Sequence, residues 1–173
     1  MKRIWFDVGA HERAMYTRSA LDTQEDLAII AFEPMYDKWG TLIAENGHER
    51  MIALPAAVST TYVNIPIRDY DIYINTFMRF SQGYLQFRRA GTDMCSSLSE
   101  VDKQANRKDW PGGCTETKYK ILVPTLRLDT IVSKLPFDFV EFIKVDAQGN
   151  DFDVVRYVHK LKLKSWLISK NAF

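Results

Sequence analysis

The sequence has little of what marks the specialised classes of protein. It holds two cysteines, Cys95 and Cys114, and neither has a histidine or a further cysteine at a spacing that binds zinc. No apolar run is long enough to span a membrane, and the first one stops at Asp7, too early for a secretion signal. The net charge of +1 provides no basic field for nucleic acid. We therefore expect a cytoplasmic protein without a metal site. The two cysteines could pair, but two separate thiols are the favoured interpretation.

The hydrophobic segments of the sequence are typical of a folded domain. A chain of 173 residues, 46% of them hydrophobic and 26% charged, can bury one core. Its first part alternates apolar runs typical of buried strands with segments of helical spacing, at residues 3–9, 11–22, 27–32, 34–46 and 51–54. This alternation predicts a parallel sheet with right-handed crossovers. We therefore predict one α/β domain over residues 1–173, built on a doubly wound, mostly parallel sheet.

An insertion is predicted at about residues 71–119. The segment is rich in aromatic residues, arginine, serine and glycine, and we expect a lid, a substrate-facing insertion or a partly disordered stretch. Its aromatic residues recur at helical spacing: Tyr73, Phe77, Phe80, Tyr84 and Phe87. This favours a helix over about residues 73–89 that packs on the core. The alternative, with Arg88 and Arg89 interleaved, is a stacking surface for a sugar, nucleotide or RNA.

The rest of the chain repeats the strand and helix patterns. We expect strands at 63–67, 120–123, 139–146 and 165–168, and helices at 130–135 and from residue 151 onward. Asp129 and Asp151 are expected to cap these two helices. Phe152 is expected on the apolar face of the second.

Three predicted strands end in an acidic residue, namely Asp7, Glu33 and Asp146. Because the carboxyl ends of parallel strands meet at one edge of a sheet, we expect a ligand there. Glu33 follows Gly9 at about the spacing at which an acid meets the ribose hydroxyls of an adenosine ligand. The alternatives are local: Glu33 would cap the helix after Pro34, and Asp7 would cap a turn or helix.

The turn after the first strand carries a single glycine, Gly9. A dinucleotide site uses several glycines to cradle a diphosphate, and Asp7 would repel that anion. A carboxylate suits a ligand that carries a cation and no phosphate, such as S-adenosylmethionine. A nicotinamide-dependent oxidoreductase is therefore the less favoured hypothesis.

Five motifs occur in an order that resembles one family. They are FDVGA (6–10), AFEP (31–34), AAVS (56–59), LDTI (128–131) and FIKVDAQGND (142–151), with weaker features at 91–92 and 96–98. Together they resemble the FkbM-like family of S-adenosylmethionine-dependent methyltransferases, from residue 4 to about 158. The resemblance implies a class I methyltransferase fold, which is Rossmann-like. It also implies methyl transfer to a hydroxyl oxygen, which we expect to belong to a small molecule or sugar.

The resemblance also implies site residues. By position, the residues that would hold the cofactor are Asp7, Gly9 and Ala10 for its methionine part, Glu33 for its ribose, and Ala57 and Val58 for its adenine. Asp146 would face the transferred methyl and is the first candidate for general base or acceptor orienter. Lys144 is expected on the same strand face as Asp146, where it would tune that carboxylate or merely extend from the sheet. His11 is a second candidate base, or a capping residue.

An alternative from another functional class is a non-catalytic remnant of the fold that binds a nucleoside or a protein partner. Arg13 stands where the family usually carries another glycine in the first turn. A full methyltransferase sheet has two more strands after the fifth, so the sheet is predicted to be shortened at the C-terminus. Its open edge would favour pairing between two copies of the chain.

Overall fold

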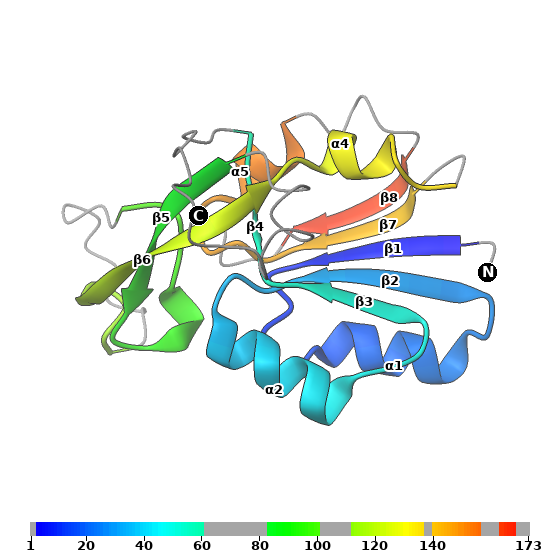
Figure 1. The fold of residues 1–173 in the computed structure, drawn as a ribbon, viewed down its shortest axis with the longest axis horizontal. Coiled ribbons are helices and arrows are strands. Elements are labelled where there is room, and N and C mark those ends of the chain that lie inside the picture. Colours follow the sequence, from blue (N-terminus) through cyan, green and yellow to red (C-terminus); the bar gives the residue numbers. More distant parts are fainter. Residues whose placement is uncertain (1–2, 61–82, 101–111, 137–139, 157–162, 169–173) are drawn as a thin grey trace, which may run out of the picture.

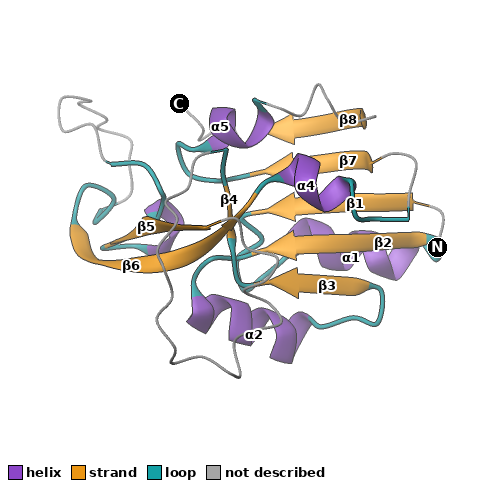
Figure 2. Cartoon of the chain, turned by 45° about the horizontal axis from the view of Figure 1, so that its top comes forward, coloured by secondary structure: helices purple, strands orange, loops and turns teal. Residues whose placement is uncertain are grey.

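Within the described residues, the main sheet has five parallel strands with the first strand at its centre. The computed structural model describes residues 3–60, 83–100, 112–136, 140–156 and 163–168. In spatial order the strands are β3 (Met51–Leu54), β2 (Leu27–Phe32), β1 (Arg3–Val8), β7 (Val140–Val145) and β8 (Leu163–Ile168). Figure 2 shows all five pointing the same way. The order reverses at β1, which confirms the doubly wound sheet.

Helices cover both faces of this sheet. They are α1 (Met15–Thr23), α2 (Tyr36–Asn46), α4 (Leu128–Val132) and α5 (Asp151–Val155). In Figure 1, α1 and α2 lie below the strands and α4 above them. Along β1, Phe6 and Val8 belong to the core cluster that includes Leu128 of α4, whereas Trp5 packs with the cluster that contains Leu21 of α1. This alternation follows from the twofold repeat of a strand buried on both sides.

A second, smaller sheet stands at the carboxyl ends of the main strands (Figure 2). Its strands, in spatial order, are β4 (Ala57–Val58), β6 (Thr117–Leu126) and β5 (Gly83–Ala90), and the short 3-10 helix η1 (Asp93–Cys95) follows β5. The described part of the predicted insertion therefore forms a wall opposite the strand ends. The predicted strand at 63–67 lies outside the described residues.

The helix predicted over residues 73–89 is wrong where the structure describes it. Residues 83–90 form β5, which pairs antiparallel with β6. Tyr84 and Phe87 have an odd spacing, so they lie on opposite faces of a strand, and the helical period of the aromatics was coincidental here. Arg88 is buried, and its guanidinium donates to the carbonyl oxygens of Cys95 at 2.6 Å and Cys114 at 3.2 Å. The stacking surface thus loses this cation to internal hydrogen bonds.

Several predicted element ends also shift. The first helix begins at Met15 instead of residue 11, because His11 and Ala14 have φ of 56° and 41° in a longer turn. The strand predicted at 120–123 extends over the ten residues of β6. The two expected capping residues lie inside α4 and α5, whose N-cap positions are Arg127 and Asn150. Phe152 is 57% exposed, so it is not on the buried face of α5.

The two cysteines are joined. Cys95 and Cys114 form a disulfide, which corrects the expectation of separate thiols. The bond ties η1 to the turn that precedes β6, two segments that pairing in the small sheet already brings together. In the described part of the chain, no helix is both long and apolar enough to cross a membrane.

Candidate active site

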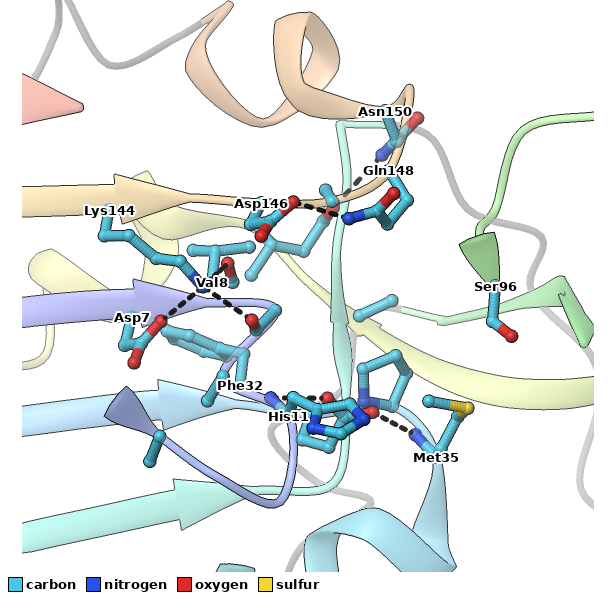
Figure 3. Close-up of a pocket in the computed structure, with 18 of the residues that line it drawn as sticks. Asp7, Val8, His11, Phe32, Met35, Ser96, Lys144, Asp146, Gln148 and Asn150 are labelled. Atoms are coloured by element: carbon cyan, nitrogen blue, oxygen red, sulfur yellow. Dashed lines mark hydrogen bonds and ion pairs between the residues drawn. The ribbon is translucent and has the colours of Figure 1, made fainter. Parts of the chain in front are cut away.

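A cavity of about 280 Å³ lies between the carboxyl ends of the main strands and the small sheet. All nine site residues predicted from the sequence line it: Asp7, Gly9, Ala10, His11, Glu33, Ala57, Val58, Lys144 and Asp146. The opposite wall includes Phe87 of β5, Asp93 of η1, and Ser96 and Leu98 after it. Figure 3 shows Asp7, Lys144 and Asp146 on one side of the cavity and Ser96 on the other.

The turn at Gly9 is built so that only glycine fits. Gly9 has a φ of +72°, and a Cβ placed on it would lie 2.0 Å from the carbonyl oxygen of Asp146. The amide of Asp146 donates to the carbonyl oxygen of Val8 at 2.9 Å, which holds the two strand ends together. The missing side chain therefore lets the loop after β7 pack directly on the turn after β1.

The amides of this turn are already used inside the protein. The N–H groups of Gly9 and Ala10 both donate to the carbonyl oxygen of Phe32 at 3.0 Å. The N–H of His11 donates to Glu33 Oε2 at 2.9 Å. A phosphate-binding turn needs such amides directed at its ligand, so these three cannot serve a diphosphate.

Glu33 is a buried carboxylate at the end of β2. Its Oε1 accepts a hydrogen bond from the amide of Met35, the N-cap residue of α2, at 2.9 Å, and its Oε2 binds His11. The amide that Oε1 accepts belongs to the N-cap residue itself, and α2 has no side-chain cap, so the capping role considered from the sequence is not present. Because each carboxylate oxygen can accept more than one hydrogen bond, Glu33 can still accept one from a ligand in the cavity. Burial raises the pKa of Glu33 to about 7, although the two amides and Lys144 oppose the shift.

Lys144 forms an ion pair with Asp7, a partner that was not expected from the sequence. Asp7 and Lys144 are register partners on β1 and β7. The ammonium lies 3.0 Å from Asp7 Oδ1, close enough for an ion pair although Oδ1 accepts no hydrogen bond. Asp146 lies one residue beyond the end of β7, where the alternation of a strand no longer fixes side-chain direction.

Asp146 is oriented by a residue that the sequence analysis missed. Gln148 Nε2 donates to Asp146 Oδ1 at 2.6 Å, and Gln148 has a φ of 52°. A non-glycine residue with positive φ is uncommon and clusters at functional sites. Its place inside the recognised motif at 142–151 was the available signal. Asn150, from the same loop, donates to the carbonyl oxygen of Val58 at 3.4 Å (Figure 3).

The comparison with known proteins settles the family. A family model described as the methyltransferase FkbM domain matches residues 7–170. The chain belongs to the FkbM methyltransferase family. A search of curated proteins and a search of solved structures each gave no match.

Ion pairs around Asp93, which lines the cavity of this FkbM domain, connect β5 and η1 to α2. Lys38 lies 2.9 Å from both Glu12 and Asp93. Arg89 contacts Asp37 at 2.6 Å and Asp93 at 3.2 Å. Asp93 therefore joins the two halves of the cavity, and nothing in its sequence context had singled it out.

His11 and Arg13 both line this cavity. Burial lowers the pKa of His11, so its imidazole is neutral at neutral pH and able to accept a proton. Arg13 lines the cavity but is an exposed residue. Its side chain thus has room in solvent and need not occupy the floor of the cavity.

Proposed function

We propose that this FkbM domain is an S-adenosylmethionine-dependent O-methyltransferase that acts on a hydroxyl of a small molecule or sugar. The observation that carries the proposal is the combination of consumed turn amides with two carboxylates, Glu33 and Asp146, at the same cavity. Such a site offers acceptors to hydroxyls and cations and offers no donors of the turn to phosphate. It favours S-adenosylmethionine over a nicotinamide dinucleotide.

The residues present fit the cofactor. Glu33 would accept hydrogen bonds from the ribose hydroxyls. The apolar residues Ala57 and Val58 would lie beside the adenine. The turn at Gly9 and Ala10 would hold the methionine part. The bound cofactor would supply an electrophilic methyl group on sulfur.

The chain itself must orient the acceptor and remove its proton. We assign this to Asp146, whose carboxylate is fixed by Gln148 through one oxygen. His11 is the second candidate, since its neutral imidazole can take a proton. Holding the acceptor oxygen in line with the methyl would supply a large part of the rate.

The proposal also covers the acceptor, self-association and the cellular location of the protein. The acceptor would enter between the main sheet and the wall formed by the small sheet, where Phe87 and Leu98 provide apolar surface. A nucleic-acid acceptor is not favoured, because Arg88 is buried and Arg89 is ion-paired.

A second copy would pair along β8, the last strand of the sheet, and size-exclusion chromatography would test this. We retain a cytoplasmic location, where reducing conditions would oppose the disulfide.

The competing function is a non-catalytic binding module. Arg13 in the cavity lining is the observation that favours it, because a cation there opposes a sulfonium ligand electrostatically. Only the enzyme would transfer methyl groups to an acceptor, whereas the binding module would bind its ligand without a reaction.

Calorimetry with S-adenosylmethionine, S-adenosylhomocysteine and NAD tests the cofactor. We expect binding of the first two and none of NAD, and the reverse result would contradict the proposal. Transfer of a labelled methyl group to a panel of sugars and small alcohols then separates an enzyme from a binding module. In this assay Asp146→Asn should bind S-adenosylhomocysteine normally and lose about 10²- to 10⁴-fold in rate, the usual contribution of a general base. A wild-type rate would show that Asp146 has another role.

A further inference from the structure

We propose that Lys144, Asp7 and Thr17 form a buried lock that shapes the cofactor turn, so that Lys144 and Asp7 are positioning residues. Neither then acts directly on the acceptor or on the cofactor's cation. The inference rests on the proposed function in one respect, that the turn at Gly9 is a cofactor site. It reassigns Asp7, which the resemblance placed beside the methionine part of the cofactor, and it gives Lys144 a structural role in place of tuning Asp146.

The ammonium group of Lys144 holds the turn after β1. Its Nζ donates to the carbonyl oxygen of Gly9 at 2.6 Å and to that of Val8 at 3.5 Å, and it pairs with Asp7. The side chain of Lys144 is 10% exposed and that of Asp7 is 6% exposed. One buried cation thus fixes the direction of two carbonyl groups at the turn that meets the cavity (Figure 3).

The other oxygen of Asp7 contacts α1. Thr17 Oγ1 donates to Asp7 Oδ2 at 2.5 Å, and Thr17 is 2% exposed. Thr17 belongs to the first turns of α1 and does not line the cavity. The carboxylate therefore links β7 to α1 through β1, and both its oxygens lie against groups of the protein.

The charges of Asp7 and Lys144 cancel each other inside the protein. Asp7 and Lys144 are opposite charges 3.0 Å apart in a buried setting, so the pair presents no net charge to a ligand. Removing one member of such a pair leaves an uncompensated charge in the interior, which is costly. Asp7 therefore supports the shape of the turn, and the ligand's cation must find its counter-charge elsewhere in the cavity.

Two ligand-free measurements test the lock itself. Hydrogen exchange should show the amides of residues 9–11 exchanging at least about tenfold faster in Lys144→Met, because their turn loses its anchor. Thr17→Val should raise exchange at the same amides, whereas Thr23→Val, a substitution at the exposed end of the same helix, should not. Unchanged exchange in Lys144→Met would refute the lock, whatever the protein binds.

Binding of S-adenosylhomocysteine then tests the consequence for the site. Thr17→Val should weaken binding about three- to tenfold, the equivalent of one buried hydrogen bond, although Thr17 lies outside the cavity. Thr23→Val should bind within about twofold of wild type. A Thr17→Val protein that is folded by circular dichroism and binds normally would contradict the positioning role.

The pair of Asp7 and Lys144 supplies the deciding comparison. If they act as a pair, Asp7→Asn with Lys144→Met should bind S-adenosylhomocysteine more tightly than Lys144→Met alone, because the orphaned carboxylate is gone. If Asp7 held the ligand's ammonium directly, the double variant would bind more weakly than Lys144→Met. Failure of the wild type to bind either cofactor form would instead refute the proposed function and leave the exchange result as the test of the lock.

Discussion

Replacing Gly9 by alanine should be among the most damaging single-methyl changes in the chain. The new Cβ would lie 2.0 Å from the carbonyl oxygen of Asp146 and 2.9 Å from its carbonyl carbon, both backbone atoms. In addition, the left-handed conformation at φ +72° costs an L-residue about 1–2 kcal/mol. Since the loop after β7 must move to relieve the contact, we expect a total loss of about 3 kcal/mol or more in the free energy of unfolding.

The matched control is Gly40→Ala in α2. A Cβ at Gly40 meets nothing within 4 Å, and the residue lies inside an exposed part of the helix. Alanine there should raise stability by about 0.5–1 kcal/mol through helix propensity. Thermal unfolding would report this as a fall of about 6–12 °C for Gly9→Ala against a small rise for Gly40→Ala. A Gly9→Ala protein with unchanged melting temperature and normal S-adenosylhomocysteine binding would refute the packing argument.

Two further predictions concern Glu33 and the disulfide. Because the pKa of Glu33 is raised from 4.5 to about 7, the folded state holds a proton that the unfolded state has lost, and stability should fall as pH rises from 4.5 to 7. Relative to Glu33→Gln, the wild type should lose on the order of 3 kcal/mol across this window in urea unfolding, and parallel pH profiles would contradict the assignment. Reducing the Cys95–Cys114 bond, which spans 19 residues, should cost about 3 kcal/mol. Unfolding with and without dithiothreitol measures it, a Cys95→Ser/Cys114→Ser variant should not respond, and two titratable thiols in unreduced denatured protein would show that the bond is absent.

The main sheet could be predicted because its strands carry their own evidence. The run that became β2 is apolar throughout, and those that became β1 and β7 are mostly apolar, which is typical of parallel strands buried on both sides. Glu33 and Asp146 directly follow β2 and β7, and Asp7 is the last residue but one of β1. Once the sheet is parallel, those acids must gather at one edge, so the list of cavity residues followed from chain order alone.

The small sheet could not be read in this way. β5 depends on β6, whose paired residues lie 27 to 42 positions further along the chain, and such pairing is decided by tertiary context more than by local pattern. The aromatic spacing at Tyr84 and Phe87 fits a helix and a strand equally well over so few residues. The disulfide likewise depends on the pairing that brings η1 beside the turn before β6, since cysteine spacing alone does not decide between thiols and a bond.

The preference for a sulfonium cofactor over a diphosphate now rests on different atoms. In the sequence, the charge of Asp7 was expected to repel phosphate. In the folded protein Lys144 neutralises that charge, so by itself it decides nothing. What disfavours a diphosphate is that Phe32 and Glu33 already accept the hydrogen bonds of all three amides from Gly9 to His11. Because Glu33 is one of these acceptors, the residue proposed to bind the ribose also closes the turn to phosphate, and a single carboxylate contributes to both halves of cofactor choice.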